Sequence, residues 1–275
     1  MFASIKDALA KPAQGSSTTS NIMRLKTGNT YVLRLVPFVK DPSKTFFHYY
    51  SHGWVSEATG QFQSAISPQT WGERDPIAEA RYKISRTGTE EEKEKAKALN
   101  RKENWLINVY VAKDPENPEN EGKVFLFRYG KKIFDKLMAA MQPEFEDETP
   151  INPFDFWEGA NFKLKIRKVD GYWNYDKSEF DNPSALFDND GKIEEVWKSA
   201  YPLAEFSAST NFKSYEELKT RLDAVLSGSV TVGNVAEQIE DEPVATPKID
   251  TTPVQSSSEE EDDDTMDYFQ KLATG

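Results

Sequence analysis

Three segments of the sequence place positively charged side chains next to aromatic ones. Their residues are Arg101, Lys102 and Trp105; Phe127, Arg128, Tyr129, Lys131 and Lys132; and Lys163, Lys165, Arg167, Tyr172, Trp173 and Tyr175. Cations neutralise phosphates, and flat rings give unstacked bases a surface on which to stack. Each segment alone is better explained by core aromatics and solvated charges. Their combination in one chain favours a surface that holds single-stranded nucleic acid.

Other chemistries have little support in the residues present. The chain has no cysteine and only two histidines, His48 and His52. This composition excludes a disulfide framework, a thiolate zinc site and a cysteine nucleophile. Two imidazoles without a third ligand make a poor zinc site, so both histidines are interpreted as partly buried or surface residues and no metal is expected. Residues 188–195 (DNDGKIEE) are interpreted as a turn, since the flanking residues cannot complete a calcium loop.

No motif of a known catalytic site was found either. The sequence has no Walker loop, no G-x-G-x-x-G and no G-x-S-x-G elbow, and its carboxylates show no two-metal spacing. The chain is therefore expected not to be an enzyme. A metal-dependent nuclease stays open as an alternative, which would degrade DNA in the presence of magnesium.

The charges are unevenly distributed along the chain. The whole sequence has 46 acidic residues, 34 lysines and arginines, and a net charge of −12. Residues 237–275 contain twelve of the acidic residues and two of the basic ones, a net charge of −10, which leaves −2 for the rest. Such asymmetry predicts an acidic interaction tail attached to a nearly neutral body.

Three regions are expected. Residues 1–21 form an N-terminal arm and linker, in which Phe2, Ile5 and Leu9 share one helical face beside Lys6. Residues 22–228 form the folded core. Residues 229–275 are rich in Val, Thr, Pro, Ser and acidic residues, and are expected to be disordered.

Within the core, aromatic and β-branched residues predict strands, and amphipathic patterns predict helices. Strands are expected over residues 30–38, 46–55, 104–112, 123–130 and 161–169, and helices over 89–102, 131–141 and from Ser214 to Gly228. Residues 56–88 are interpreted as irregular. Thr89 with Glu92, and Ser214 with Glu217, have the spacing of capping boxes. The pattern predicts an α+β fold, mainly β, built on a small β-barrel with added helices.

No apolar run approaches the roughly 20 residues that span a bilayer, and the N-terminus lacks the apolar stretch of a signal peptide. A soluble intracellular protein is expected.

Two long runs, residues 113–137 (KDPENPENEGKVFLFRYGKKIFDKL) and 156–180 (FWEGANFKLKIRKVDGYWNYDKSEF), resemble the single-stranded-DNA-binding, helix-destabilising proteins of T-even-like bacteriophages. Weaker similarity extends from about residue 24 to residue 218. The resemblance implies an OB-fold whose cleft holds the strand through Arg101, Trp105, Phe127, Arg128, Tyr172 and Tyr175. Trp105 and Phe127 stand where the family has tyrosines.

The resemblance also implies roles for both termini. The arm, with Phe2, Ile5, Lys6 and Leu9, would support cooperative binding along the strand, although it lacks the basic run of the family. The tail would contact replication and recombination proteins and compete with DNA for the cleft. The tail residues that fit this role are acids followed by an apolar anchor, Glu259, Glu260, Glu261, Asp262, Asp263, Asp264, Tyr268 and Phe269.

The family's structural zinc, held by one histidine and three cysteines, is expected to be absent. His52 lies near the matching histidine, whereas the Cys-Pro-x-Cys stretch of the family matches Asp75-Pro76-Ile77-Ala78. Residues 56–88 are instead expected to be held by packing of Trp54, Phe62, Trp71 and Tyr82.

The sequence therefore predicts a sequence-tolerant protein that coats single-stranded DNA in phage replication, recombination and repair, in the cytoplasm of the infected host. Its partners would be single-stranded DNA, further copies of itself along the strand, and replication proteins at the tail. The alternative is a protein-interaction adaptor that acts through its acidic tail and binds no DNA.

Overall fold

A computed structural model of the protein describes residues 21–38, 41–55, 62–97, 99–208 and 212–226. The acidic tail and all of the N-terminal arm except Asn21 lie outside the described residues. Within the described part of the chain, no helix is long and apolar enough to cross a membrane.

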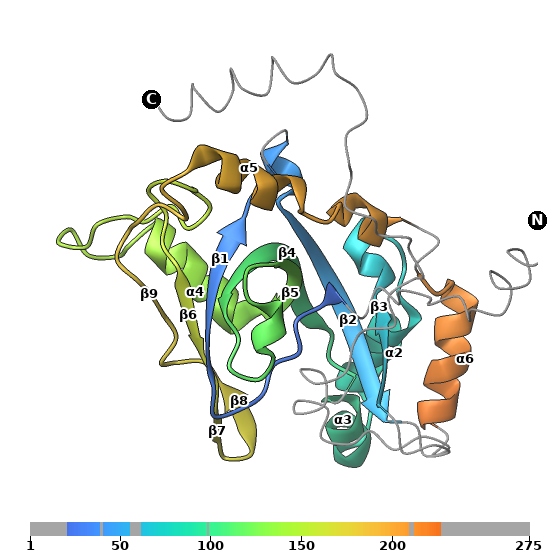
Figure 1. Ribbon diagram of the computed structural model, residues 1–275. Helices are drawn as coiled ribbons and strands as arrows, with labels where there is room; N and C mark the ends of the chain where they lie inside the picture. The colour runs from blue at the N-terminus through green and yellow to red at the C-terminus, as the bar shows by residue number, and fades with distance from the viewer. Residues whose placement is uncertain (1–20, 39–40, 56–61, 98, 209–211, 227–275) are drawn as a thin grey trace, which may run out of the picture.

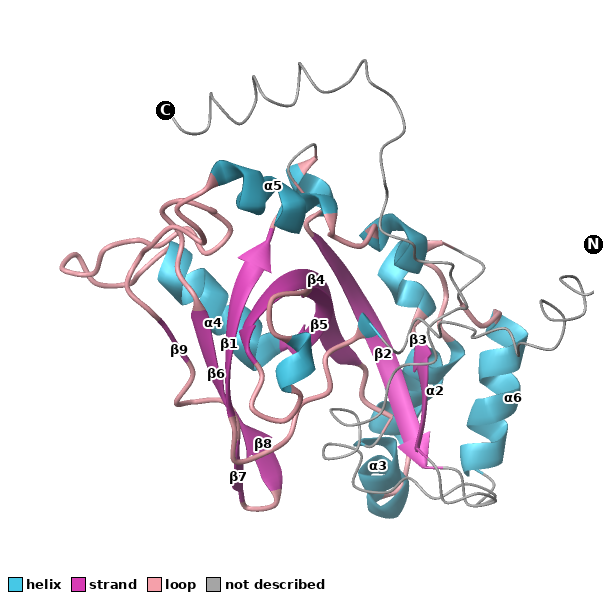
Figure 2. Cartoon of the chain, in the orientation of Figure 1, coloured by secondary structure: helices cyan, strands magenta, loops and turns pink. Residues whose placement is uncertain are grey.

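A seven-stranded, mostly antiparallel sheet forms the centre of the molecule (Figures 1 and 2). Its strands are β1 (Thr30–Val36), β2 (Phe46–Val55), β3 (Phe62–Ile66), β4 (Lys102–Lys113), β5 (Val124–Gly130), β6 (Phe162–Lys165) and β9 (Glu179–Phe180). They follow the order β3-β2-β4-β1-β6-β9, and β5 pairs with β4 outside this path. A separate hairpin consists of β7 (Arg167–Val169) and β8 (Tyr172–Asn174).

The long strand β4 organises the sheet. Its first half pairs with β2, from Lys102 opposite Ser51, and its second half pairs with β1, up to Lys113 opposite Val32. Strand β5 pairs with β4 as well, and β4 curves strongly through the centre of the molecule (Figure 1). Since no ladder joins β3 to β9 among the described residues, the sheet does not close into the predicted barrel. The fold is a mixed α/β arrangement around an open antiparallel sheet.

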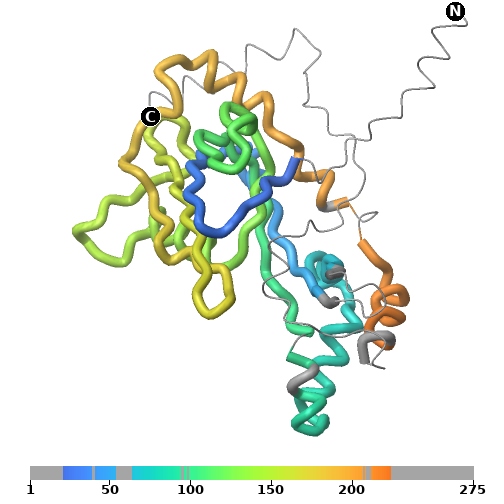
Figure 3. Tube along the Cα trace, turned by 60° about the horizontal axis from the view of Figure 1, so that its bottom comes forward, coloured from blue at the N-terminus to red at the C-terminus, as the bar shows by residue number. Residues whose placement is uncertain are grey.

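The described residues include five α-helices around the sheet: α2 (Pro76–Thr87), α3 (Glu90–Lys97), α4 (Lys131–Met141), α5 (Asp190–Lys198) and α6 (Tyr215–Leu226). Helices α2, α3 and α6 group beside the β2–β3 end of the sheet, away from the β7–β8 hairpin (Figures 1 and 3). Ile77 of α2 and Leu218 and Leu222 of α6 are buried together there, so this group has a small core of its own. Helix α4 turns Ile133 and Leu137 into the main core.

The main core is formed by apolar residues on β1, β4, β5 and β6. Ile107, Val109 and Val111 of β4 are completely buried, as are Leu164 of β6 and Tyr31 of β1. Apolar burial of this kind is the main source of stability in a folded chain. The strand ends that border the functional site are thus anchored in the core.

Much of the predicted secondary structure is confirmed. Strand β2 and helix α4 have the predicted bounds, and both capping boxes form. The backbone N–H of Thr89 donates to the Glu92 carboxylate at 2.7 Å, and the N–H of Ser214 donates to Glu217 at 2.9 Å. The run 161–169 alternates as expected up to Ile166, with Phe162, Leu164 and Ile166 buried.

Several predictions were wrong. The stretch 56–88, predicted to be irregular, contains β3 and α2, because Asp75 caps the helix and Pro76 occupies its first turn. Residues 190–198 form α5, since Asn189 accepts a hydrogen bond from the Lys192 N–H instead of ending a turn. The helix predicted to reach residue 102 ends at Lys97.

Candidate nucleic-acid interface

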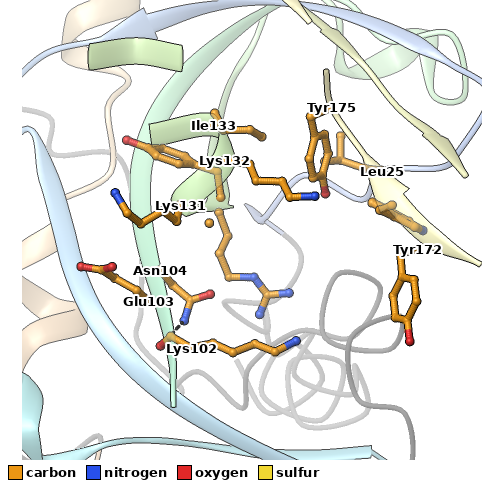
Figure 4. Close-up of a pocket in the computed structure, with 13 residues that line it drawn as sticks. Leu25, Lys102, Glu103, Asn104, Lys131, Lys132, Ile133, Tyr172 and Tyr175 are labelled. Atoms are coloured by element: carbon orange, nitrogen blue, oxygen red, sulfur yellow. Dashed lines mark hydrogen bonds between the residues drawn. The ribbon is translucent and has the colours of Figure 1, made fainter. Parts of the chain in front are cut away.

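A cleft of about 410 Å³ opens where β4 begins and β5 ends. The start of α4 and the β7–β8 hairpin complete its walls. In Figure 4, Tyr172 and Tyr175 lie on one side of the opening, and Lys102, Glu103 and Lys131 lie on the other. The lining residues are Leu25, Lys102, Glu103, Asn104, Arg128, Tyr129, Gly130, Lys131, Lys132, Ile133, Tyr172, Trp173 and Tyr175.

A tight turn positions the aromatic wall of this cleft. Val169 pairs with Tyr172, so Asp170 and Gly171 alone connect β7 to β8. Both have positive φ, 53° and 83°, which is the conformation of a two-residue hairpin turn with the Asp-Gly sequence it prefers. The ring of Tyr172 directly follows this turn and is 46% exposed. It is therefore available to a ligand.

The other two aromatic residues of the hairpin segment support this wall from inside. Trp173 and Tyr175 are buried, and their rings meet edge to face at 6.4 Å. Tyr129 at the cleft floor is also buried, and burial raises the pKa of its hydroxyl. These three rings therefore shape the walls and floor of the cleft, but each exposes only a small part of its surface to it.

Cations line the rest of the cleft. Lys131 and Lys132 are exposed at the first turn of α4, while Arg128 is half-buried on β5. The Lys131 ammonium donates to the Asp135 carboxylate at 2.7 Å, and this hydrogen bond raises the pKa of Lys131. Because the pair is well exposed, solvent screens it strongly and a phosphate can compete for the lysine.

The structure brings together most of the predicted site residues. The predicted residues in the cleft are Lys102, Arg128, Tyr129, Lys131, Lys132, Tyr172, Trp173 and Tyr175. Arg101 lines a neighbouring pocket instead. Five others, Trp105, Phe127, Lys163, Lys165 and Arg167, line neither pocket.

Trp105 and Phe127 were predicted to stack on bases, but both belong to the core. Trp105 is 4% exposed and lies between His48 and Phe134, with ring centroids 4.8 and 4.3 Å away. Phe127 is 1% exposed and packs against Tyr129. Helix α4 supplies Phe134 and covers this face of the sheet, so neither ring has a free face for a base.

The predicted cations of β6 and β7 make other contacts. The Lys163 ammonium bonds to Asp181, and the Lys165 ammonium donates to Glu179 at 2.7 Å. Arg167 is exposed, and its Nε donates to the Asn174 side chain at 3.2 Å. The alternation of residues 161–169 correctly predicted that Lys163 and Lys165 point away from the core. It could not predict that they lie at the β6–β9 edge of the sheet, where they do not line the cleft.

Other residues of the cleft were missed by the sequence reasoning. Leu25, Glu103, Asn104, Gly130 and Ile133 also line it. The Glu103 carboxylate contacts His48 Nε2 at 2.9 Å, and the Asn104 amide donates to Ser51 at 2.9 Å. In the sequence, the position of Glu103 and Asn104 between the predicted site residues Lys102 and Trp105 is the one feature that could have pointed to them.

A buried polar network connects β2 to the start of α2. His52 is 2% exposed, contrary to the expected partial burial, and its Nε2 lies 2.8 Å from Oδ2 of Asp75. The Ser67 hydroxyl donates to the same carboxylate oxygen, and His52 Nδ1 lies 3.2 Å from the carbonyl oxygen of Leu99. Every polar atom of the His52 ring is thus hydrogen-bonded within the protein.

The residues at this position do not fit a structural zinc ion. Tetrahedral protein sites use four ligands, commonly cysteine and histidine. Here both ring nitrogens of His52 have other partners, and the described residues contain no group of three His, Cys, Asp or Glu side chains able to hold a metal. Of the residues expected to pack there in its place, Tyr82 is 62% exposed and so does not belong to the core, while the side chains of Trp54 and Phe62 lie outside the described part of the structure.

Comparisons with known proteins place this cleft in a shared region. The family described as gp32 DNA binding protein like matches residues 26–226, which include every cleft residue except Leu25. The single-stranded DNA-binding protein of Enterobacteria phage T4 is 35% identical over 208 residues, which cover 74% of this chain and 68% of the relative. The single-stranded DNA-binding protein of Enterobacteria phage T2 is 36% identical over 209 residues, with the same coverage.

Proposed function

The chain belongs to the gp32-like family of DNA-binding proteins, and from this premise we propose that its cleft holds single-stranded DNA. The protein binds and coats single strands during phage DNA replication, recombination and repair, and it is not an enzyme. It acts in the cytoplasm of the infected host cell.

One observation carries the assignment of the cleft. The exposed ring of Tyr172 lies across the opening from Lys102 and Lys131, with Arg128 and Lys132 in the same cleft. A base stacks on the tyrosine while the cations contact the flanking phosphates. Neither contact reads the edge of a base, so binding tolerates any sequence.

The central sheet supports an assignment to an elaborated OB-fold. Such folds bind strands across a curved antiparallel sheet and its loops. Here β4 is strongly curved (Figure 1), pairs with three other strands, and begins at the cleft. The added helices α2, α3 and α6 belong to the elaboration.

The two termini complete the proposal from their sequence. The acidic residues Glu259–Asp264 followed by Tyr268 and Phe269 recruit replication and recombination proteins and compete with DNA for the cations of the cleft. The N-terminal arm contacts a neighbouring copy through Phe2, Ile5 and Leu9, which makes binding along the strand cooperative. The core and both termini act as three separable regions, with bounds at residues 21 and 228.

The protein folds without zinc. The support for this is the hydrogen-bonded trio of His52, Asp75 and Ser67, which occupies the position where the family resemblance implies zinc ligands. Its side-chain hydrogen bonds join β2 to α2. Removal of metal by a chelator is expected to leave both the circular dichroism spectrum and DNA binding unchanged.

Fluorescence anisotropy of a labelled oligo-dT tests the cleft. The substitution Tyr172→Ala removes the ring and is expected to weaken binding by about 1–3 kcal/mol, the contribution of one stacked base. With about four to six phosphates contacted, log K should fall with log salt concentration at a slope of about −3 to −4. Lys132→Gln should reduce this slope by about 0.7, since one phosphate contact is lost.

The matched control is Phe145→Ala, which removes a ring that is 63% exposed and does not line the cleft. It should bind like the unchanged protein. If the unchanged protein does not bind oligo-dT at low salt, the adaptor alternative replaces the DNA-binding function. If Tyr172→Ala and Phe145→Ala behave alike, DNA binds elsewhere on the surface.

A further inference from the structure

A second pocket of about 460 Å³ lies between α2 and the residues that precede β4. Arg81 and Tyr82 of α2 line it from one side, and Arg101 and Gln69 line it from the other. Arg101 of this pocket and Lys102 of the cleft are consecutive residues. The two pockets are therefore bordered by adjacent residues at the start of β4.

Arg101 is held in place by its neighbours. Its guanidinium lies over the ring of Tyr50, 4.0 Å from the centroid, and donates to the Gln69 side-chain oxygen. A guanidinium fixed on an aromatic ring keeps several N–H groups free to bind a phosphate, because it has five of them. A strand held by both Lys102 and Arg101 must pass from the cleft into this second pocket.

The charge of the second pocket also suits a phosphate chain. Glu79 is the one acidic residue among those described that line it, and both of its oxygens are engaged, by Arg74 at 2.9 and 3.1 Å and by the Tyr215 hydroxyl at 2.9 Å. Arg81 is exposed and makes no ion pair with another described residue. The pocket thus presents the charges of Arg81 and Arg101 with its carboxylate already compensated.

Tyr82 supplies the aromatic surface. Its ring is 62% exposed, although it was expected to pack in the core. Arg86 lies over it, 5.4 Å from the centroid, and donates to its hydroxyl at 2.6 Å. The contact with Arg86 restrains the ring while leaving much of it open, which is the arrangement a stacked base requires.

We propose that single-stranded DNA leaves the cleft past Lys102 and Arg101 and enters this second pocket, where Arg81 contacts a phosphate and Tyr82 stacks on a base. The proposal rests on the proposed function, because it extends the path of the same strand. It makes α2 a second part of the binding surface and predicts that oligonucleotide length decides which residues matter.

The test compares labelled oligo-dT of two lengths, about 5 and about 12 nucleotides, both within the range of a single OB-fold. The full chain is used with Arg81→Gln and Tyr82→Ala. Each change is expected to weaken binding of the longer oligonucleotide about tenfold and to leave the shorter one unaffected. Arg81→Gln should also lower the salt slope for the longer strand by about 0.7.

Two variants make the result specific. Lys83→Gln removes a neighbouring exposed cation of α2 that does not line the pocket, and it should bind both lengths like the unchanged protein. Tyr82→Phe keeps the ring and should retain binding of the longer strand. Thermal unfolding of all variants checks that the helix stays folded.

Three results would overturn the proposal. Arg81→Gln and Tyr82→Ala could leave the longer oligonucleotide unaffected, they could weaken both lengths equally, or Lys83→Gln could match Arg81→Gln. The last result would mean that only the overall charge of α2 matters. Absence of binding by the unchanged protein at either length would instead contradict the proposed function itself.

Discussion

Nε2 of His52 on β2 lies 2.8 Å from Oδ2 of Asp75, the residue that caps α2, and both side chains are buried. The other carboxylate oxygen of Asp75 accepts hydrogen bonds from the backbone N–H groups of Ile77 at 2.9 Å and Ala78 at 3.2 Å. Ser67 donates to the first oxygen. One carboxylate therefore fastens a strand, a turn and a helix to one another.

Removing this carboxylate is expected to be strongly destabilising. Asp75→Ala leaves His52, Ser67 and the two backbone N–H groups of α2 without their acceptor in a buried site. Breaking a buried pair by deleting one partner costs about 3–5 kcal/mol. Urea unfolding at pH 7, followed by circular dichroism, should show this loss in the free energy of unfolding.

Asp41→Ala is the matched control for Asp75→Ala. Asp41 also accepts a backbone hydrogen bond, from Ser43 at 3.2 Å, but at an exposed turn. Its loss is expected to cost about 0.5–1 kcal/mol, the lower range for a cap. Equal destabilisation by the two changes would show that the buried network contributes little.

The stabilisation from Asp75 should depend on pH in one direction. Burial alone would raise the pKa of Asp75, but hydrogen bonds from His52 and Ser67 and the attraction of His52 lower it below its ordinary value. A carboxyl group with a depressed pKa in the folded state stabilises fully above its unfolded pKa of about 3.9 and loses this contribution as the pH falls through the folded value.

The measurement is the difference in unfolding free energy between the unchanged protein and Asp75→Asn. It should shrink as the pH falls below about 4. Taking the difference cancels the titration of exposed carboxylates that both proteins share. A difference that grows as the pH falls below about 4 would contradict the depressed pKa.

Phe127 is expected to matter for stability and not for DNA contact, because its ring is 1% exposed. Phe127→Ala should cost about 3–5 kcal/mol of unfolding free energy. Phe127→Leu keeps most of the apolar volume and should cost about 1 kcal/mol. The leucine variant, folded under the assay conditions, should bind oligo-dT with unchanged affinity. A loss of about 1–3 kcal/mol in binding would instead indicate base stacking.

Local sequence predicted much of the secondary structure. Helix α4 and strand β2 have the predicted bounds because their patterns of apolar residues are regular. Helix α2 was missed because residues 56–88 have no such pattern. Its start depends on Asp75 as a cap, and the burial of that carboxylate depends on His52, 23 residues away. Contacts of this range leave no periodic signal in the sequence.

The cleft was predicted in part for a related reason. Alternation along a strand tells which residues share a face, but not what covers that face. Trp105 and Tyr172 are equally good candidates by type, yet Phe134 of α4 covers one, and the Asp170–Gly171 turn presents the other to solvent. Whether a ring is free thus depends on packing by another part of the chain, here helix α4.

The acidic tail is expected to weaken DNA binding by repulsion and competition. Removing residues 229–275 eliminates a net charge of −10 from a chain of net charge −12. A protein that ends at Gly228 should therefore bind oligo-dT more tightly than the full chain at low salt. The difference should shrink as salt rises, because the Debye length is about 10 Å at 0.1 M and shorter above it. Replacing Glu259–Asp264 by Gln and Asn in the full chain separates charge from length: it should reproduce most of the gain. Equal affinities of all three proteins at low salt would show that the tail does not act on the cleft.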